Sequence, residues 1–303
     1  MTSPAYRGRF APSPTGPLHF GSLVAAVASH ADARHQHGSW LVRIDDVDQT
    51  RCRPGAEEQI LRALQTFGMQ SDQAPISQSD RTSRYHEILE QLDRQGHVYL
   101  CGCSRKTIAA VANVGSEGPI YPGTCRSNPP EPTAAVAWRL SVNNDEIEFN
   151  DRVVGPISQN LATDIGDFVV RRIDGFTAYQ LAVVVDDFDQ GITHIVRGAD
   201  LLWSTPRQIW LQQLLEFPTP RYAHIPLVYA QDGHKLSKCD QAHPVDESDP
   251  VRGLISAWEH LGQLKPNETL QTSDAFWNWA IPRWEPCRIP HDRNSRHERT
   301  DTL

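Results

Sequence analysis

Residues 9 to 22 read Arg9-Phe10-Ala11-Pro12-Ser13-Pro14-Thr15-Gly16-Pro17-Leu18-His19-Phe20-Gly21-Ser22. A short strand is expected over Tyr6–Ala11, and a helix is expected over Gly21–His37. The prolines exclude a helix and an interior strand, so the segment predicts a loop from a strand to a helix N-terminus. Free N–H groups and the helix dipole favour bound phosphate there. Gly21 lets a nucleotide approach, and His19 can donate a hydrogen bond to a phosphate oxygen.

Strands and helices alternate around this loop. A strand is expected at Trp40–Ile44, followed by amphipathic helices over Pro54–Phe67 and Asp80–Gln95. Further along, Asp167–Arg171 and the apolar run Tyr179–Val185 flank an Asp-Gly turn and predict a hairpin. Strands that alternate with helices of this length favour a parallel sheet, so we expect an α/β, doubly wound, Rossmann-like fold.

Changes in composition and in the pattern of expected elements divide the chain into four expected regions. Residues 1–98 and 161–230 form the two halves of the Rossmann-like catalytic domain, separated by a Cys-containing insertion over 99–160. Residues 231–303 hold a lysine-bearing loop and a small, mostly helical C-terminal unit. Trp277, Trp279 and Trp284 have near-helical spacing there, which favours packing within that unit over stacking on RNA bases.

Composition narrows the class of protein. The 303 residues include 29 Lys+Arg and 37 Asp+Glu, a formal net charge of −8, which excludes a simple basic DNA-binding protein. No apolar run approaches the roughly 18 residues of a membrane helix, and no apolar signal segment opens the chain. Six cysteines do not make a disulfide scaffold. We expect a cytoplasmic protein with neither membrane nor DNA as partner.

A second motif, Lys235-Leu236-Ser237-Lys238, follows Gly233. A loop with two lysine ammonium groups three residues apart can fold over a triphosphate. The ammonium groups can then neutralise the negative charge that develops during phosphoryl transfer. Alone, either motif is unspecific. Together and in this order, His19-x-Gly21 and the lysine loop resemble the two signatures of class I aminoacyl-tRNA synthetases.

Neighbouring segments narrow the resemblance. Arg9–Gly16, Arg43–Asp48 and Val196–Asp200 resemble the glutamyl branch. A discriminating glutamyl-tRNA synthetase continues into a large anticodon-binding region, whereas only a short segment follows the lysine loop here. The short form, with its Cys-x-Cys and Tyr-x-x-x-Cys segments, resembles the glutamyl-Q tRNA(Asp) synthetase family.

This resemblance implies an activity and its partners. Members activate L-glutamate with ATP and Mg²⁺ and esterify it to the queuosine base in the anticodon of tRNA(Asp), with no covalent enzyme intermediate. The expected partners are therefore ATP, L-glutamate and queuosine-bearing tRNA(Asp), and we expect a monomer. No residue of the sequence stands out as the general base for the transfer step.

The resemblance also assigns roles to residues. Catalytic roles fall to His19, Lys235 and Lys238, and ATP contacts to His19, Gly21 and Lys238. Guanidinium groups of arginine suit a carboxylate of glutamate, and a carboxylate of the protein suits its ammonium. Asp45 stands where the family usually has the longer Glu, so a water molecule can bridge Asp45 to the substrate. The expected glutamate contacts are Arg9, Phe10, Ala11, Pro12, Ser13, Asp45, Tyr179 and Arg197.

Cys101, Cys103 and Cys125 form a candidate metal site, because thiolates are strong zinc ligands. A structural zinc ion needs four ligands. The family supplies the fourth with a tyrosine, which matches Tyr121, and His97 is the rival. We expect one structural Zn²⁺.

Three alternatives remain open on the sequence. The chain can be a catalytic core that charges tRNA 3′ ends, a small-molecule adenylyltransferase, or a non-catalytic RNA-binding relative, although the last would be expected to lose His19 or Lys238. Asp186, Asp187 and Asp189 can bind Mg²⁺, but a loop at a strand end is the favoured interpretation.

Overall fold

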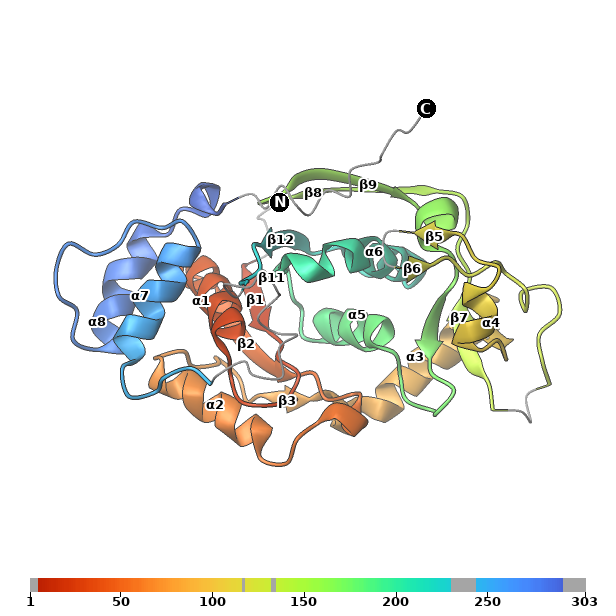
Figure 1. Ribbon diagram of the computed structural model, residues 1–303, viewed down its shortest axis with the longest axis horizontal. Helices are drawn as coiled ribbons and strands as arrows, with labels where there is room; N and C mark the ends of the chain where they lie inside the picture. The colour runs from red at the N-terminus through yellow and green to blue at the C-terminus, as the bar shows by residue number, and fades with distance from the viewer. Residues whose placement is uncertain (1–4, 116–117, 132–134, 230–243, 291–303) are drawn as a thin grey trace.

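The computed structural model describes residues 5–115, 118–131, 135–229 and 244–290 (Figure 1). Its centre is a parallel sheet with the strand order β12-β11-β1-β2-β3. The fold is therefore the α/β, Rossmann-like arrangement that the alternating pattern predicts. The five strands are β1 (Arg7–Phe10), β2 (Ser39–Ile44), β3 (Ile76–Ser77), β11 (His194–Gly198) and β12 (Arg221–Ile225).

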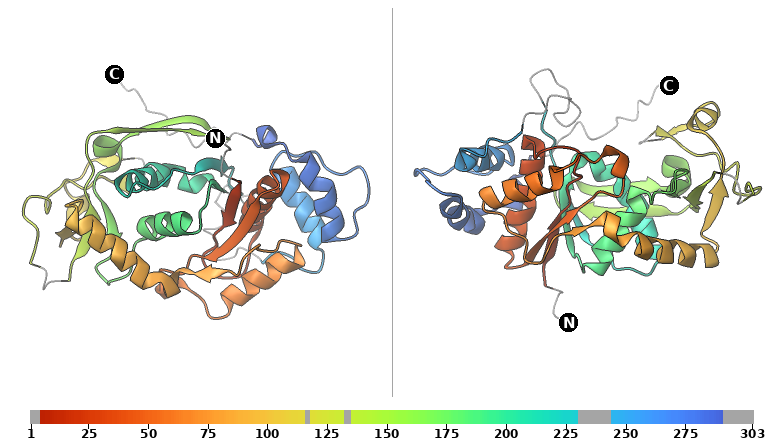
Figure 2. Two further views of the ribbon diagram at one scale, coloured as in Figure 1. Left: turned by 180° about the vertical axis from the view of Figure 1, so that it is seen from behind. Right: turned by 90° about the horizontal axis from the view of Figure 1, so that it is seen from below.

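Helices cover both faces of this sheet. Figures 1 and 2 show α7 and α8 packed beside α1, with α5 and α6 on the other side of the strands. No helix in the described part of the chain is long and apolar enough to cross a membrane. The helices are α1 (Phe20–His35), α2 (Ala56–Thr66), α3 (Thr82–Arg94), α5 (Tyr179–Asp189), α6 (Thr205–Leu214), α7 (Pro250–His260) and α8 (Ser273–Ala280).

The two faces of the sheet bury different cores, because successive strand residues point in opposite directions. Along β2, Trp40, Val42 and Ile44 join the core under α1, α2, α7 and α8. Leu41 joins the core that contains α3, α5 and α6. By the same alternation, Arg43 points toward α5 from a position with no exposed surface.

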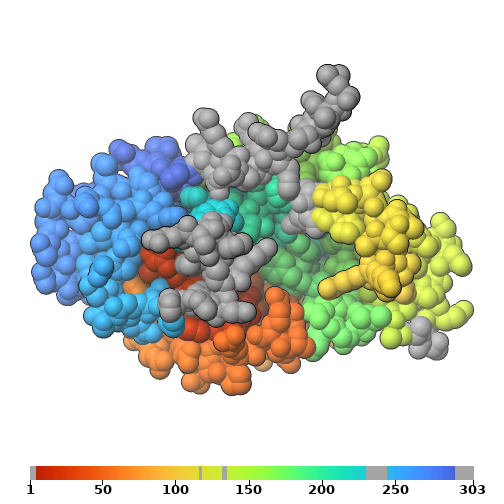
Figure 3. Space-filling view, in the orientation of Figure 1, coloured from red at the N-terminus to blue at the C-terminus, as the bar shows by residue number. Residues whose placement is uncertain are grey.

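A separate group of strands lies toward the end of the molecule opposite α7 and α8 (Figures 1 and 3), and one of its hairpins extends back along α6 to β12. Three of its strands form an antiparallel sheet in the order β10-β7-β4, and two hairpins accompany it. Its elements are β4 (Val98–Cys101), α4 (Arg105–Ala109), β5 (Val114–Gly115), β6 (Gly118–Pro119), β7 (Ala137–Leu140), β8 (Glu146–Asp151), β9 (Gly155–Asn160) and β10 (Phe168–Arg171).

The hairpin predicted around the Asp-Gly turn is wrong in its second half. Residues Tyr179–Asp189 form the helix α5, and β10 pairs with β7. The run Leu181–Val185 is buried on every side between α3, α6 and β10, so it carries no polar face. A fully buried helix has no amphipathic period, and its β-branched valines imitate a strand.

The C-terminal tryptophans pack as expected from their spacing. Trp277 and Trp284 are buried, and Trp279 packs against the same core. The Trp277 indole also donates a hydrogen bond to the Phe67 carbonyl oxygen at 2.8 Å. These contacts attach the C-terminal helices to the end of α2 and to the core under α1.

Gly38 provides a test of the β1–β2 register. A Cβ at this position would lie 2.5 Å from the Tyr6 carbonyl oxygen and 2.6 Å from its Cβ, at the start of the pairing. We expect Gly38→Ala to lower the free energy of unfolding by about 1–3 kcal/mol, since overpacking forces the backbone apart. Chemical denaturation measures this; Gly16→Ala, where a Cβ meets nothing within 4 Å, is the control. Equal stability of the two variants would contradict the register.

Candidate active site

A cavity of about 500 Å³ opens at the carboxyl ends of β1, β2, β11 and β12. Doubly wound sheets bind ligands in this position. The cavity brings together most of the residues predicted from the sequence. Lys235 and Lys238 lie outside the described residues. The predicted residues that line the cavity are Arg9, Phe10, Ala11, Pro12, Ser13, His19, Gly21, Asp45, Tyr179 and Arg197.

His19 and Gly21 stand at one end of the cavity, at the first turn of α1. The His19 ring caps the helix by accepting the Ser22 backbone N–H at 3.3 Å, and it lies 3.0 Å from the Ser22 hydroxyl. A Cβ on Gly21 would sit 3.3 Å from the His19 ring, so glycine keeps this turn open. Val228 lines the same end and Pro244 bridges to His19, so the chain that flanks the lysine loop meets the cavity here.

Arg197 projects into the cavity from β11. It is almost fully buried, and its guanidinium donates to the His224 ring at 3.0 Å, the Gln208 side chain at 2.8 Å and the Thr205 hydroxyl at 2.8 Å. None of these three acceptors is a carboxylate. A guanidinium held by neutral acceptors keeps its charge for an anionic ligand.

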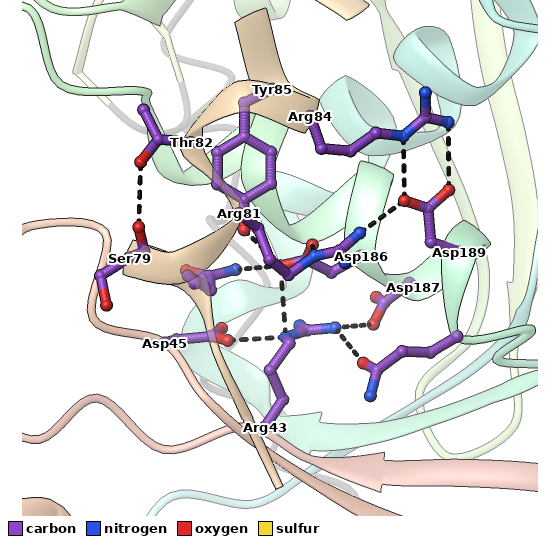
Figure 4. Close-up of polar contacts among 12 residues, drawn as sticks. Arg43, Asp45, Ser79, Arg81, Thr82, Arg84, Tyr85, Asp186, Asp187 and Asp189 are labelled. Carbon is purple, nitrogen blue, oxygen red and sulfur yellow. Dashed lines mark hydrogen bonds and ion pairs between the residues drawn. The ribbon is translucent and has the colours of Figure 1, made fainter. Parts of the chain in front are cut away.

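Arg9 differs from Arg197 because it is already paired. Its Nε atom donates to Asp187 at 3.1 Å, and the same Asp187 oxygen accepts from Arg43 Nη1 at 2.7 Å. Arg43 Nε in turn donates to Asp45 at 2.8 Å (Figure 4). Arg9, Arg43, Asp45 and Asp187 are all buried. This chain of contacts fixes Arg9 and Asp45, two predicted glutamate contacts, to the last turn of α5.

Asp186 and Asp189 extend the network away from the cavity. Asp186 accepts hydrogen bonds from Gln78, Arg81 and Tyr85 at 2.6 to 2.8 Å, and Asp189 binds Arg81 and Arg84 (Figure 4). The expected loop at a strand end is therefore wrong, since these carboxylates belong to α5. Arginines neutralise both carboxylates. Among the described residues, neither carboxylate belongs to a group that could hold a metal ion.

The sequence interpretation missed Arg43 and Asp187 as parts of the site. One signal was available for Arg43, because a charged residue in the buried strand pattern Trp40–Ile44 needs a partner. Nothing local identified Asp187 as that partner, since 144 residues separate the two.

Tyr179 begins α5 and lies within electrostatic reach of Arg9, Asp45 and Arg197. Burial raises the pKa of its hydroxyl, which therefore stays protonated and can donate a hydrogen bond. The cavity thus combines cations, a carboxylate and a neutral donor around one space, and its other end offers a helix N-terminus. An amino acid and a nucleotide fit that distribution of charge.

The three predicted cysteine ligands meet in the insertion. The sulfur atoms of Cys101, Cys103 and Cys125 lie within 4.8 Å of one another, and the Tyr121 hydroxyl is 3.4 Å from Cys101 Sγ and 3.5 Å from Cys103 Sγ. Ligand atoms around a tetrahedral zinc ion stand about 3.8 Å apart, so this set fits the ion. His97 precedes β4, at the end opposite Cys101, and does not belong to the group.

The surroundings act on the thiols unequally. Although a hydrogen bond from Tyr121 acts to lower it, burial and the neighbouring thiols raise the pKa of Cys103, whereas the contacts of Cys125 and a nearby cation favour thiolates. Although burial acts to raise it, hydrogen bonds from the Tyr121 hydroxyl and a backbone N–H hold the pKa of the Cys125 thiol below its usual value. Arg139 donates to Cys101 Sγ at 3.2 Å and lies 3.9 Å above the Tyr121 ring. A buried cation in this position offsets the negative charge of thiolate ligands.

Comparisons with known proteins agree on one family. Residues 5–254 match the family described as tRNA synthetases class I (E and Q), catalytic domain. The chain is 52% identical over 289 residues to the glutamyl-Q tRNA(Asp) synthetase of Burkholderia cenocepacia, covering 93% of this chain and 97% of that protein. It is 50% identical over 291 residues to the protein of the same name in Aromatoleum aromaticum, covering 95% and 91%.

A solved structure has the same fold. It is a glutamate tRNA ligase from Elizabethkingia meningosepticum in complex with its amino acid, with a TM-score of 0.77 and 24% identity. The superposition covers 95% of this chain and 66% of that one.

Asp45 predicts a pH dependence for the cavity. Burial raises its pKa to about 6, against the opposing effect of Arg43. An ammonium binds the carboxylate form, so we expect glutamate affinity to fall about tenfold per pH unit below about pH 6 and to stay level from pH 7 to 8. Calorimetric titration with glutamate measures this.

The Asp45→Asn variant is the comparison for that titration. It removes the titrating group, so its weaker affinity should not change between pH 5 and pH 8. Because the folded pKa exceeds the unfolded value, protonation of Asp45 also stabilises the fold as the pH falls through 6, which excludes unfolding through Asp45 as the cause of a loss. Parallel profiles for the two proteins would contradict the assignment.

Proposed function

The chain belongs to the class I tRNA synthetases (E and Q), and from that membership we propose that it activates L-glutamate with ATP and transfers the glutamyl group to the queuosine base in the anticodon of tRNA(Asp). The observation that carries this proposal is the cavity, which is lined both by Arg197, held by neutral acceptors among the described residues, and by the fixed carboxylate of Asp45. The relatives named glutamyl-Q tRNA(Asp) synthetase match over nearly their whole length, which favours this activity over 3′ charging of tRNA.

Glutamate binds as a zwitterion with an additional carboxylate. Arg197 and Arg9 bind its carboxylates, Asp45 binds its ammonium directly or through water, and Tyr179 donates its hydroxyl to the bound amino acid. The segment Phe10–Ser13 forms the wall next to β1. Arg9 donates to the carboxylate of Asp187, whereas the acceptors of Arg197 among the described residues are neutral, so Arg197 is the stronger anion-binding group.

ATP binds at the α1 end of the same cavity. Its phosphates approach Gly21, His19 and the free N–H groups of the first turn, where the helix dipole attracts negative charge. Lys235 and Lys238 neutralise the phosphates. Mg²⁺ accompanies ATP and supplies further neutralisation.

The reaction has two steps. In the first, an oxygen of the glutamate α-carboxylate attacks the α-phosphorus of ATP in line, the bond to pyrophosphate breaks, and glutamyl-adenylate forms. His19, Lys235 and Lys238 stabilise the charge that develops on the phosphates. In the second, a hydroxyl of the queuosine cyclopentenediol attacks the acyl carbon and AMP leaves.

The remaining features of the chain support this assignment. Residues 99–160 serve as an insertion that carries one structural zinc ion on Cys101, Cys103, Tyr121 and Cys125, between catalytic halves at 1–98 and 161–230. Residues 231–303 provide the two lysines and the helices α7 and α8. The protein acts as a cytoplasmic monomer, with tRNA(Asp) as its macromolecular partner.

Transfer of labelled glutamate tests the activity. With ATP and Mg²⁺, we expect incorporation into tRNA(Asp) that carries queuosine and none into the same tRNA without it. His19→Ala should lower the rate about 100-fold or more, since it removes a donor to the developing phosphate charge; His35→Ala, at the other end of α1, should leave it unchanged. Charging of tRNA(Glu) with no queuosine dependence would overturn the proposal.

Metal analysis tests the cysteine site. We expect about one zinc ion per chain in the purified protein and loss of zinc in Cys125→Ser, which removes a thiolate ligand. Tyr121→Phe should retain zinc with weaker affinity, because three thiolates remain. Cys287→Ser, at an exposed cysteine, is the matched control and should bind as much zinc as the unaltered chain. Zinc content that is equal in all four proteins would contradict the site.

A further inference from the structure

Two buried residues outside the cavity form a hydrogen-bonded pair behind Arg197. Asp151, at the end of β8, accepts a 2.6 Å hydrogen bond from His224 Nδ1 on β12, and both side chains are completely buried. The other Asp151 oxygen accepts the backbone N–H groups of Val153, Val154 and His224 at 2.9 to 3.1 Å. A carboxylate with this many donors has a fixed position and stays ionised.

Arg197 determines the proton arrangement of this pair. Its Nε–H lies 3.0 Å from His224 Nε2. A guanidinium offers only donors, so Nε2 must be the unprotonated nitrogen and Nδ1 carries the hydrogen that Asp151 accepts. Burial lowers the pKa of His224 to about 4, which keeps the ring neutral and preserves this direction near neutral pH.

The other contacts of Arg197 show the effect of placing a neutral imidazole between its guanidinium and the carboxylate of Asp151. Besides His224, its donors reach Gln208, Thr205 and the Leu201 carbonyl oxygen, and no carboxylate in the described ranges pairs with it. A carboxylate in direct contact would neutralise the guanidinium before a substrate arrived. With an imidazole between them, Asp151 orients Arg197 and leaves its charge available.

We infer that Asp151 and His224 are positioning residues for glutamate binding, acting through Arg197. The inference rests on the proposed function. It also gives the β8–β9 hairpin a role at the cavity, because Asp151 is one of the hairpin residues that reach β12. Neither residue lines the cavity, so neither contacts substrate.

Asp151→Asn tests the direction of the relay while conserving shape. An asparagine amide can donate to Nδ1, which allows His224 to carry its hydrogen on Nε2 and to oppose the Arg197 donor. In glutamate-dependent ATP–pyrophosphate exchange, we expect the KM for glutamate to rise about tenfold or more and the KM for ATP to stay within about twofold.

Two substitutions of His224 separate positioning from packing. His224→Phe fills the space but removes the acceptor for Arg197, so its glutamate KM should rise at least as much as that of Asp151→Asn. His224→Gln offers an amide oxygen to Arg197 and should recover part of the loss. His30→Phe is the matched control, because His30 is equally buried but packs against Trp40 and Trp277 on the opposite face of the sheet.

The melting temperature of each variant is measured together with its glutamate KM. A higher glutamate KM in Asp151→Asn and His224→Phe, with partial recovery in His224→Gln and none of this change in His30→Phe, supports the relay. Lower melting temperatures with a glutamate KM within about twofold overturn it. If His224→Phe does not fold, Asp151→Asn and His224→Gln decide. An unaltered chain without glutamate-dependent exchange contradicts the proposed function itself.

Discussion

The paired arginines Arg9 and Arg43, which share Asp187, hold the rest of the site together. Removing charges from water is costly, so three buried charges from β1, β2 and α5 are stable only in contact. Their contact fixes α5 against the sheet, and with it Tyr179 at the start of the helix and Asp45 at the end of β2. Breaking such a group leaves an uncompensated buried charge, so the network couples the stability of the fold to the shape of the cavity.

The cavity contains two arginines in different electrostatic states. Arg9 is largely neutralised by Asp187, whereas Arg197 donates to a neutral imidazole, an amide and a hydroxyl. Both side chains are rigidly held, but Arg197 retains more of its charge for a ligand. An amino acid with two carboxylates and one ammonium suits such an asymmetric site, because two unpaired buried guanidinium groups would repel each other and destabilise the free protein.

The insertion depends on a different kind of stabilisation. Around the cysteines the apolar core is small and consists of Cys101, Ile108, Tyr121 and Cys125, whereas Leu140, Val142 and Ile147 of the same region join the core that contains α3, α5 and α6. The converging thiols and the guanidinium of Arg139 suit a metal cross-link in place of a larger core. One of its hairpins nevertheless reaches the catalytic half through Asp151, which connects the two parts of the molecule.

The sequence by itself determined the strand–loop–helix phosphate motif around His19 and the parallel sheet, which follow from short-range patterns: prolines and glycine before a helix, and alternating elements. The resemblance to a known family, carried by its motifs, added the predicted glutamate contacts, which line the cavity. The tertiary structure alone decided that Tyr179–Asp189 is a helix, because burial on all sides erased its period. It also decided which charges pair, since Arg43 and Asp187 are 144 residues apart and Asp151 and His224 are 73 apart. Desolvation selects those partners, and it acts only once the chain has folded.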